Sequence, residues 1–227
     1  MPSDSQISRR NFLRAFAAVA ALAGTSGVSA DALKDPTVDW KSAYLSRDRT
    51  LWLRRGKDTV ECTYWSSAQR GLIKDGYYQA SWMLRDVKFE AAVQMDQSLL
   101  DVLYLMQSWL KYYGHHYPLI ITSGFRTKKN NSGLERAALN SMHLYGKAAD
   151  WIMPSVKGAI LGRMARHLTQ ELGLGGAGIY PNDDFVHTDS GRLRFWIGQG
   201  DEPGPLDLGA ERQLALLREP RRIQLLS

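Results

Sequence analysis

The sequence has 227 residues, of which 44% are hydrophobic and 23% charged, and its formal net charge is +6. This length is sufficient for one domain with a proper hydrophobic core. The charge is only mildly basic, and no dense block of lysine and arginine alternates with aromatic residues, which argues against a nucleic-acid groove. The single cysteine, Cys62, excludes an intrachain disulfide.

Residues 1–30 have the composition of an export signal. The run SRRNFLR at residues 8–14 matches a twin-arginine signal, and an apolar run at 15–23 and a small-residue cleavage site ending at Ala30 follow it. The apolar run is too short to cross a bilayer, so a membrane anchor is the weaker alternative. We therefore expect export through the twin-arginine machinery to the periplasm. The mature chain would keep a net charge of about +4, because the first 30 residues hold three Arg and one Asp.

Hydrophobic periodicity predicts one domain over residues 48–198, after an irregular lead at 31–47 and before a polar tail at 199–227. In chain order we predict a strand at 50–55, a strand at 59–64, a helix at 96–113, a strand at 117–122, a strand at 148–152, a helix at 156–172, and strands at 185–189 and 193–197. Residues 77–87 are compatible with either a short helix or an extended segment.

Local signals mark several of these boundaries. The residues Arg55-Gly56-Lys57-Asp58 form the expected turn of a hairpin between the first two strands. Asp96 is a suitable N-cap for the helix that follows it, and Gly114 is suited to end that helix. The glycine-rich segment at 173–180 lacks the lysine and the following Ser or Thr of a phosphate-binding loop, so we interpret it as a turn and a strand.

Three residues in the second half of the domain form a candidate metal site. His143, Asp150 and His187 supply two imidazoles and one carboxylate, a set that binds zinc and leaves a fourth position for water or substrate. Asp184 lies three residues before His187 in a segment that alternates like a strand, so its carboxylate is expected nearby and could accept a proton from the attacking water. The alternative is that both histidines are hydrogen-bonded structural residues.

The sequence resembles the M15-type zinc D,D-peptidases, and within them the murein endopeptidase K group, over about residues 48–197. The motifs that carry the resemblance are LRDV at 84–87, MDQSLLDVLYLMQ at 95–107, SGFRT at 123–127, SMHLYGKAAD at 141–150 and GGAGIYPNDDFVHTDSGRLRFW at 175–196. It implies an α+β fold similar to the Hedgehog/D,D-peptidase fold, with a small antiparallel sheet and helices packed on one side. It also implies that Arg126 faces the substrate peptide.

The function expected from the motif and the resemblance is hydrolysis of peptide bonds in peptidoglycan stems or cross-links by a Zn²⁺ peptidase. Asp184 is the first choice of general base, although the murein endopeptidase K group does not demand an acid there and Asp183 and Asp189 remain open. Ser141, Tyr180 and Asp189 are candidates for substrate contacts or for supporting the ligands. The type of bond cleaved stays open.

Two other classes of protein are alternatives to a zinc peptidase. A non-catalytic peptidoglycan-binding envelope protein could use the same zinc as a structural ion. A cofactor-containing oxidoreductase exported by the twin-arginine route is disfavoured, because the sequence has no cysteine cluster and no nucleotide motif.

Overall fold

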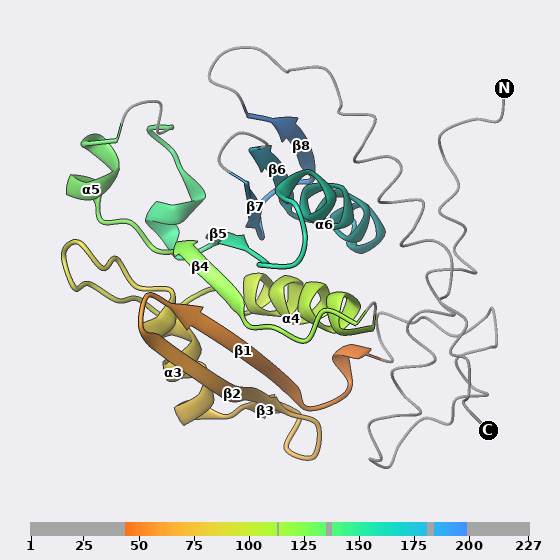
Figure 1. Ribbon diagram of the computed structural model, residues 1–227. Coiled ribbons are helices and arrows are strands. Elements are labelled where there is room, and N and C mark those ends of the chain that lie inside the picture. The colour runs from red at the N-terminus through yellow and green to blue at the C-terminus, as the bar shows by residue number, and fades with distance from the viewer. Residues whose placement is uncertain (1–43, 113, 135–137, 181–183, 199–227) are drawn as a thin grey trace, which may run out of the picture.

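The computed structural model describes residues 44–112, 114–134, 138–180 and 184–198 (Figure 1). The predicted signal at 1–30, most of the lead at 31–47 and the tail at 199–227 lie outside the described residues. The elements in chain order are β1 (Arg49–Arg55), β2 (Asp58–Ser66), β3 (Gly71–Leu72), α3 (Lys74–Met83), α4 (Gln97–Tyr112), β4 (Leu119–Ser123), α5 (Lys128–Ser132), η2 (Met142–Tyr145, one turn of 3-10 helix), β5 (Ala148–Ile152), α6 (Gly158–Leu172), β6 (Gly176–Tyr180), β7 (Phe185–Asp189) and β8 (Arg194–Ile197).

The strands form one sheet in the order β3-β2-β1-β4-β5-β7-β6-β8. The predicted α+β class is confirmed, but the sheet is neither small nor purely antiparallel. Over the described residues it has eight strands, of which β1 pairs with β4, and β6 with β8, in parallel. A parallel pair needs a long crossover connection, which α3 and α4 supply between the first hairpin and β4. The hairpin thereby extends the sheet that carries the candidate ligands.

The core forms where alternating strand residues meet amphipathic helices. In β1, Leu51 and Leu53 are fully buried while Trp52 between them is 37% exposed, as the period of two in a strand requires. Helix α3 packs against β2, α4 against β1 and β7, and α6 against β6 and β7 (Figure 1). The same core cluster includes Tyr44, which lies four residues before the predicted start of the domain.

The predicted elements mostly have the expected positions. The hairpin is confirmed, with Gly56 at a φ of +59° in its turn. The predicted helix at 96–113 is α4, and Asp96 caps it by accepting a hydrogen bond of 2.9 Å from the backbone N–H of Ser98. The open segment at 77–87 begins inside α3. None of the helices within the described ranges has both the length and the hydropathy needed to cross a membrane.

The two strands predicted at 185–189 and 193–197 are present as β7 and β8, but they are not neighbours in the sheet. β7 and β8 do not pair with each other, because β6 lies between them and pairs with both. The backbone N–H of Arg194 donates to Gly175 O, which brings β8 in parallel to β6. This arrangement puts the side chains of β8 beside the candidate site.

Candidate metal centre

A single row of residues crosses the half of the sheet that contains the predicted ligands. The strand register aligns Ser123, Asp150, His187, Gly178 and Trp196 on β4, β5, β7, β6 and β8. Residues one position along, such as Trp151 and Val186, point to the opposite face and belong to the hydrophobic core. The register therefore brings Asp150 and His187 together on the face away from the core.

His143 reaches the same place from η2, which lies beside the start of β5. Ser141 caps this turn by accepting a hydrogen bond from the backbone N–H of His143 at 3.4 Å. Gly146 ends the turn at a φ of +66°, a conformation that a residue with a Cβ rarely adopts. The His143 ring is oriented by its Nδ1, which lies 2.6 Å from the carbonyl oxygen of Gly124. Because a carbonyl only accepts, Nδ1 carries the proton and the lone pair of Nε2 faces Asp150 and His187.

Three potential ligand atoms converge at this point. Nε2 of His143 lies 3.2 Å from Nδ1 of His187 and 3.3 Å from Oδ1 of Asp150, and Nδ1 of His187 lies 2.8 Å from the same carboxylate oxygen. Tetrahedral zinc with bonds of about 2.0–2.1 Å separates its ligand atoms by about 3.3 Å. The two separations that involve His143 match this spacing, the separation between His187 and Asp150 is shorter at 2.8 Å, and all three residues are buried.

The electrostatics of the cluster also suit a cation. Burial lowers the pKa of His143, so that its imidazole is neutral at neutral pH. Burial opposes ionisation of Asp150, but His143 and His187 outweigh it and hold the carboxyl pKa well below its usual range. A proton on Nδ1 of His187 would give Asp150 a hydrogen bond. Nε2 of His143 would still face the same carboxylate oxygen as one acceptor facing another, with no hydrogen between them. A cation shared by the three atoms satisfies all of them, so these residues fit a zinc ion.

The second ring nitrogen of His187 is held by Asp189. Nε2 lies 3.0 Å from Oδ2 of Asp189, and Arg194 bonds both oxygens of that carboxylate, at 2.6 and 3.1 Å. Burial lowers the pKa of His187, but the hydrogen bonds to Asp150 and Asp189 outweigh it and raise the pKa above its usual value. At Nδ1, a proton and a metal ion therefore compete.

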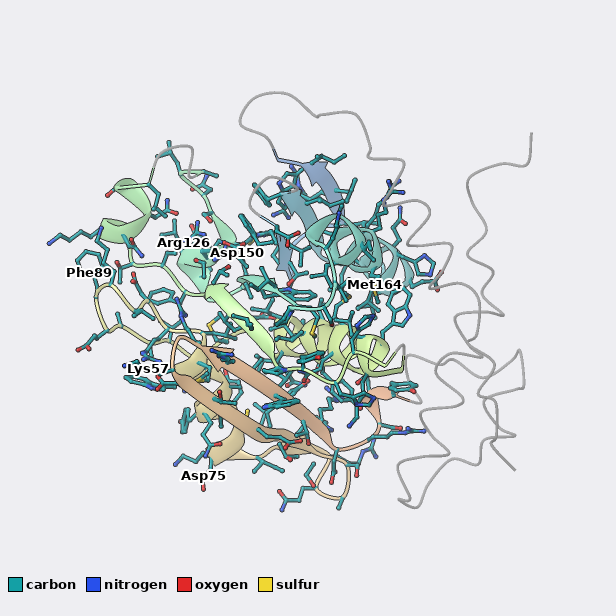
Figure 2. All side chains as sticks on the ribbon, in the orientation of Figure 1. Lys57, Asp75, Phe89, Arg126, Asp150 and Met164 are labelled. Atoms are coloured by element: carbon teal, nitrogen blue, oxygen red, sulfur yellow. The ribbon has the colours of Figure 1, made fainter. Side chains whose placement is uncertain are left out.

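Arg126 contacts one of the candidate ligands directly. Its Nη2 donates to Oδ2 of Asp150 at 2.6 Å and its Nε donates to Oγ of Ser123 at 2.8 Å, while the backbone N–H donates to His143 O. Figure 2 shows Arg126 and Asp150 next to each other where β4 meets β5. The remaining nitrogen, Nη1, has no hydrogen-bond partner within the described part of the chain. The predicted substrate-facing role of Arg126 stays a prediction, with Nη1 as the donor for it.

Asp184, the first choice of general base, lies outside the cluster of candidate ligands. Asp184 is exposed, has a φ of +55°, and accepts a hydrogen bond of 2.7 Å from the backbone N–H of Gly158 at the first turn of α6. The cluster of His143, Asp150 and His187 does not include it. Asp183 lies outside the described residues. The structure thus does not bring Asp184 to the ligands, and its predicted role requires its carboxylate to leave Gly158.

Tyr180 lies on the same sheet face, at the outer end of β6. Its ring stacks on Phe185 with centroids 4.3 Å apart, and its hydroxyl accepts a hydrogen bond of 3.1 Å from Nε1 of Trp196. Trp196 in turn lies against the His187 ring, at 5.1 Å between centroids. Tyr180 and Trp196 are thus aromatic side chains beside the candidate site.

One residue that supports the site was not identified from the sequence. Asp86 is 1% exposed and accepts hydrogen bonds from the backbone and hydroxyl of Thr127 at 2.8 and 2.9 Å and from Nδ2 of Asn130 at 3.0 Å. Thr127 directly follows Arg126, so Asp86 fixes the segment that carries the arginine. The sequence pointed to Asp86 only through the LRDV motif at 84–87. Nothing local in that motif indicates that Asp86 bonds to Thr127 and Asn130.

Comparison with known proteins identifies a family that covers the candidate site. A peptidase M15 family model described as "Peptidoglycan L,D-endopeptidase MepK" matches residues 41–196, which include the three candidate ligands. Curated proteins of that name from Escherichia coli K12 and Shigella flexneri are each 28% identical over 181 residues, which cover 77% of this chain and 94% of the relative. A probable MepK from Haemophilus influenzae is 30% identical over 121 residues, 52% of this chain and 62% of that protein. The chain therefore belongs to the M15-type family of peptidoglycan L,D-endopeptidase MepK.

Proposed function

We propose that this chain is a zinc-dependent peptidoglycan endopeptidase, of L,D type like the relatives named above. The observation that carries the proposal is the convergence of His143, Asp150 and His187, with ligand atoms 2.8 to 3.3 Å apart, inside the region that matches the family. Zinc as the ion, and a Hedgehog/D,D-peptidase-like fold around it, are parts of this proposal.

The chain's own residues would divide the work as follows. Nε2 of His143, Oδ1 of Asp150 and Nδ1 of His187 would hold the zinc ion. A zinc ion bound there polarises a peptide carbonyl and makes water a better nucleophile at neutral pH. Arg126 keeps Asp150 in place through Nη2 and offers Nη1 to a carbonyl or carboxylate of the substrate peptide.

Asp184 remains the proposed general base. In the orientation described, its carboxylate caps α6 at Gly158, so the proposal includes a rotation of the Asp184 side chain when substrate binds. The contacts of a general base often form only in the complex with substrate.

The proposed substrate also defines the place of action. Peptidoglycan lies outside the cytoplasmic membrane, and the SRRNFLR run at residues 8–14 would direct the folded chain there through the twin-arginine machinery. We therefore place the protein in the periplasm.

The test is digestion of purified peptidoglycan by the chain, with the products identified by mass and the zinc content measured on the same sample. We expect new muropeptides whose masses identify the bond, and their loss in His143→Ala. His116→Ala, which removes an exposed histidine outside the cluster, is the matched control and should retain both zinc and activity. Bound zinc without products from any wall preparation would instead support a non-catalytic peptidoglycan-binding protein.

A further inference from the structure

We infer that Arg194 is a positioning residue for the metal site, acting through Asp189 on His187. The inference rests on the proposed zinc site and adds to it a residue on β8 that is not itself a ligand. Arg194 would fix the orientation of the His187 ring through the buried carboxylate of Asp189.

Asp189 is fully buried and receives only hydrogen-bond donors. Oδ1 accepts from the backbone N–H groups of Gly176 at 3.1 Å and Gly191 at 2.8 Å, and from Nη1 of Arg194 at 3.1 Å. Oδ2 accepts from Nη2 of Arg194 at 2.6 Å and lies 3.0 Å from Nε2 of His187. These are five contacts on about four lone-pair positions, and an ionised carboxylate can only accept hydrogen bonds. Nε2 of His187 must therefore be a donor, which leaves Nδ1 facing Asp150 and His143.

Arg194 holds this carboxylate by two parallel bonds, a geometry that fixes orientation as well as position. The register places Arg194 opposite Gly176, and a Cβ on that glycine would lie 3.0 Å from Cζ of Arg194 and would overlap Oδ2 of Asp189. Gly176 thus leaves the space in which the arginine crosses from the edge strand β8 to a carboxylate on β7. The guanidinium also lies over the Trp196 ring, 5.1 Å from its centroid.

The consequence is a chain of contacts from the sheet edge to the metal cluster, from Arg194 through Asp189 to the His187 ring. Groups that bind the second nitrogen of a metal-bound histidine fix its orientation, and their loss typically weakens metal binding about 10- to 100-fold. A salt bridge that served only to hold β8 on the sheet would have no such effect.

The experiment compares full-length wild type, Arg194→Gln and Arg194→Lys by zinc affinity, measured by competition with a chromogenic chelator. The thermal midpoint of each zinc-free chain is measured in parallel. We expect about 10- to 100-fold weaker zinc binding for Arg194→Gln and an intermediate loss for Arg194→Lys, which keeps the charge but not the two-pronged geometry. Arg192→Gln, an exposed arginine in the same segment, is the control and should bind zinc like wild type.

A second readout identifies the nitrogen involved. Long-range ¹H–¹⁵N spectra of the zinc-loaded wild type should show zinc on Nδ1 of His187 and a proton on Nε2. If Arg194→Gln and Arg194→Lys lose thermal stability but bind zinc within twofold of wild type, Arg194 is only structural and the inference is wrong. If wild type itself binds no zinc, the proposed function fails and the inference fails with it, an outcome distinct from the first.

Discussion

Replacing Asp86 with asparagine should destabilise the domain much more than the same change at an exposed position. The two oxygens of Asp86 receive four donors: Oδ2 accepts from the backbone and hydroxyl of Thr127, and Oδ1 from Asn130 and from the backbone N–H of Lys88 at 3.1 Å. An asparagine has one oxygen, so in either orientation its NH₂ group faces two of these donors. At about 1.5 kcal/mol for each lost bond to a charged acceptor, the expected loss is about 3 kcal/mol.

The measurement is the thermal midpoint of unfolding for wild type, Asp86→Asn and Asp75→Asn. For a domain of this size a loss of 3 kcal/mol corresponds to about 6–12 °C. Asp75 is exposed in the first turn of α3, so its substitution removes at most a helix-end interaction of about 1 kcal/mol or less. Equal midpoints for the two variants would refute the reasoning, because the four bonds to Asp86 would then contribute no net stability.

The pH dependence gives an independent check of the same residue. Burial opposes ionisation of Asp86, but the hydrogen bonds from Thr127 and Asn130 outweigh it and hold its pKa below the usual range. A carboxyl whose pKa is lower in the folded state contributes stability that is present above its unfolded pKa, about 3.9, and is lost as the pH falls through the folded value. The difference in unfolding free energy between wild type and Asp86→Asn should therefore narrow below about pH 4. A difference that stays constant from pH 7 to pH 3 would contradict this assignment.

Three further predictions concern the base, the sheet and the cysteine. Asp184→Asn keeps an oxygen that can accept the hydrogen bond from Gly158, so the stability and the zinc content should be unchanged. The turnover of peptidoglycan should fall about 10²- to 10⁴-fold. Near-normal turnover would show that Asp184 only caps the helix. Gly178→Ala places a Cβ 2.5 Å from Cε2 of Trp196, which forces the neighbouring strand to shift. The free energy of unfolding in denaturant should therefore fall by about 1–3 kcal/mol. An unchanged midpoint would mean that β8 moves without penalty. Burial raises the pKa of Cys62 to about 11, so its thiol should not react with a disulfide reagent at pH 8 until the chain is unfolded, and rapid reaction of the native chain would contradict this.

The features that could be predicted from the sequence are those with a local cause. The hairpin at Gly56 and the start of α4 at Asp96 follow from turn and capping chemistry within a few residues. The ligand set could be proposed because residue type alone restricts which side chains bind zinc. In the structure Gly146, at a φ of +66°, ends the turn that carries His143 before the strand of Asp150.

The features that were missed depend on contacts between distant segments. Nothing local in residues 193–197 indicates that β8 crosses over to pair with β6, because a strand does not encode its partner in its own periodicity. The glycines of β6 were correctly placed in a turn and a strand, but the reason for Gly178 is a tryptophan eighteen positions later. For the same reason, Arg126 could be interpreted only as a substrate contact, because its bond to Asp150 requires the pairing of β4 and β5.

Asp86 and its neighbours in the chain also support the candidate metal site. Leu84, two residues earlier, accepts a hydrogen bond of 2.7 Å from the backbone N–H of Phe125, and a Cβ on Gly124 would overlap the Leu84 backbone. The carbonyl of that same Gly124 orients the His143 ring. The end of α3 thus contacts the backbone that directs one ligand, while Asp86 fixes the segment whose arginine directs another. Because these contacts are all made by the chain itself, we expect zinc to bind to ligands that are already in place.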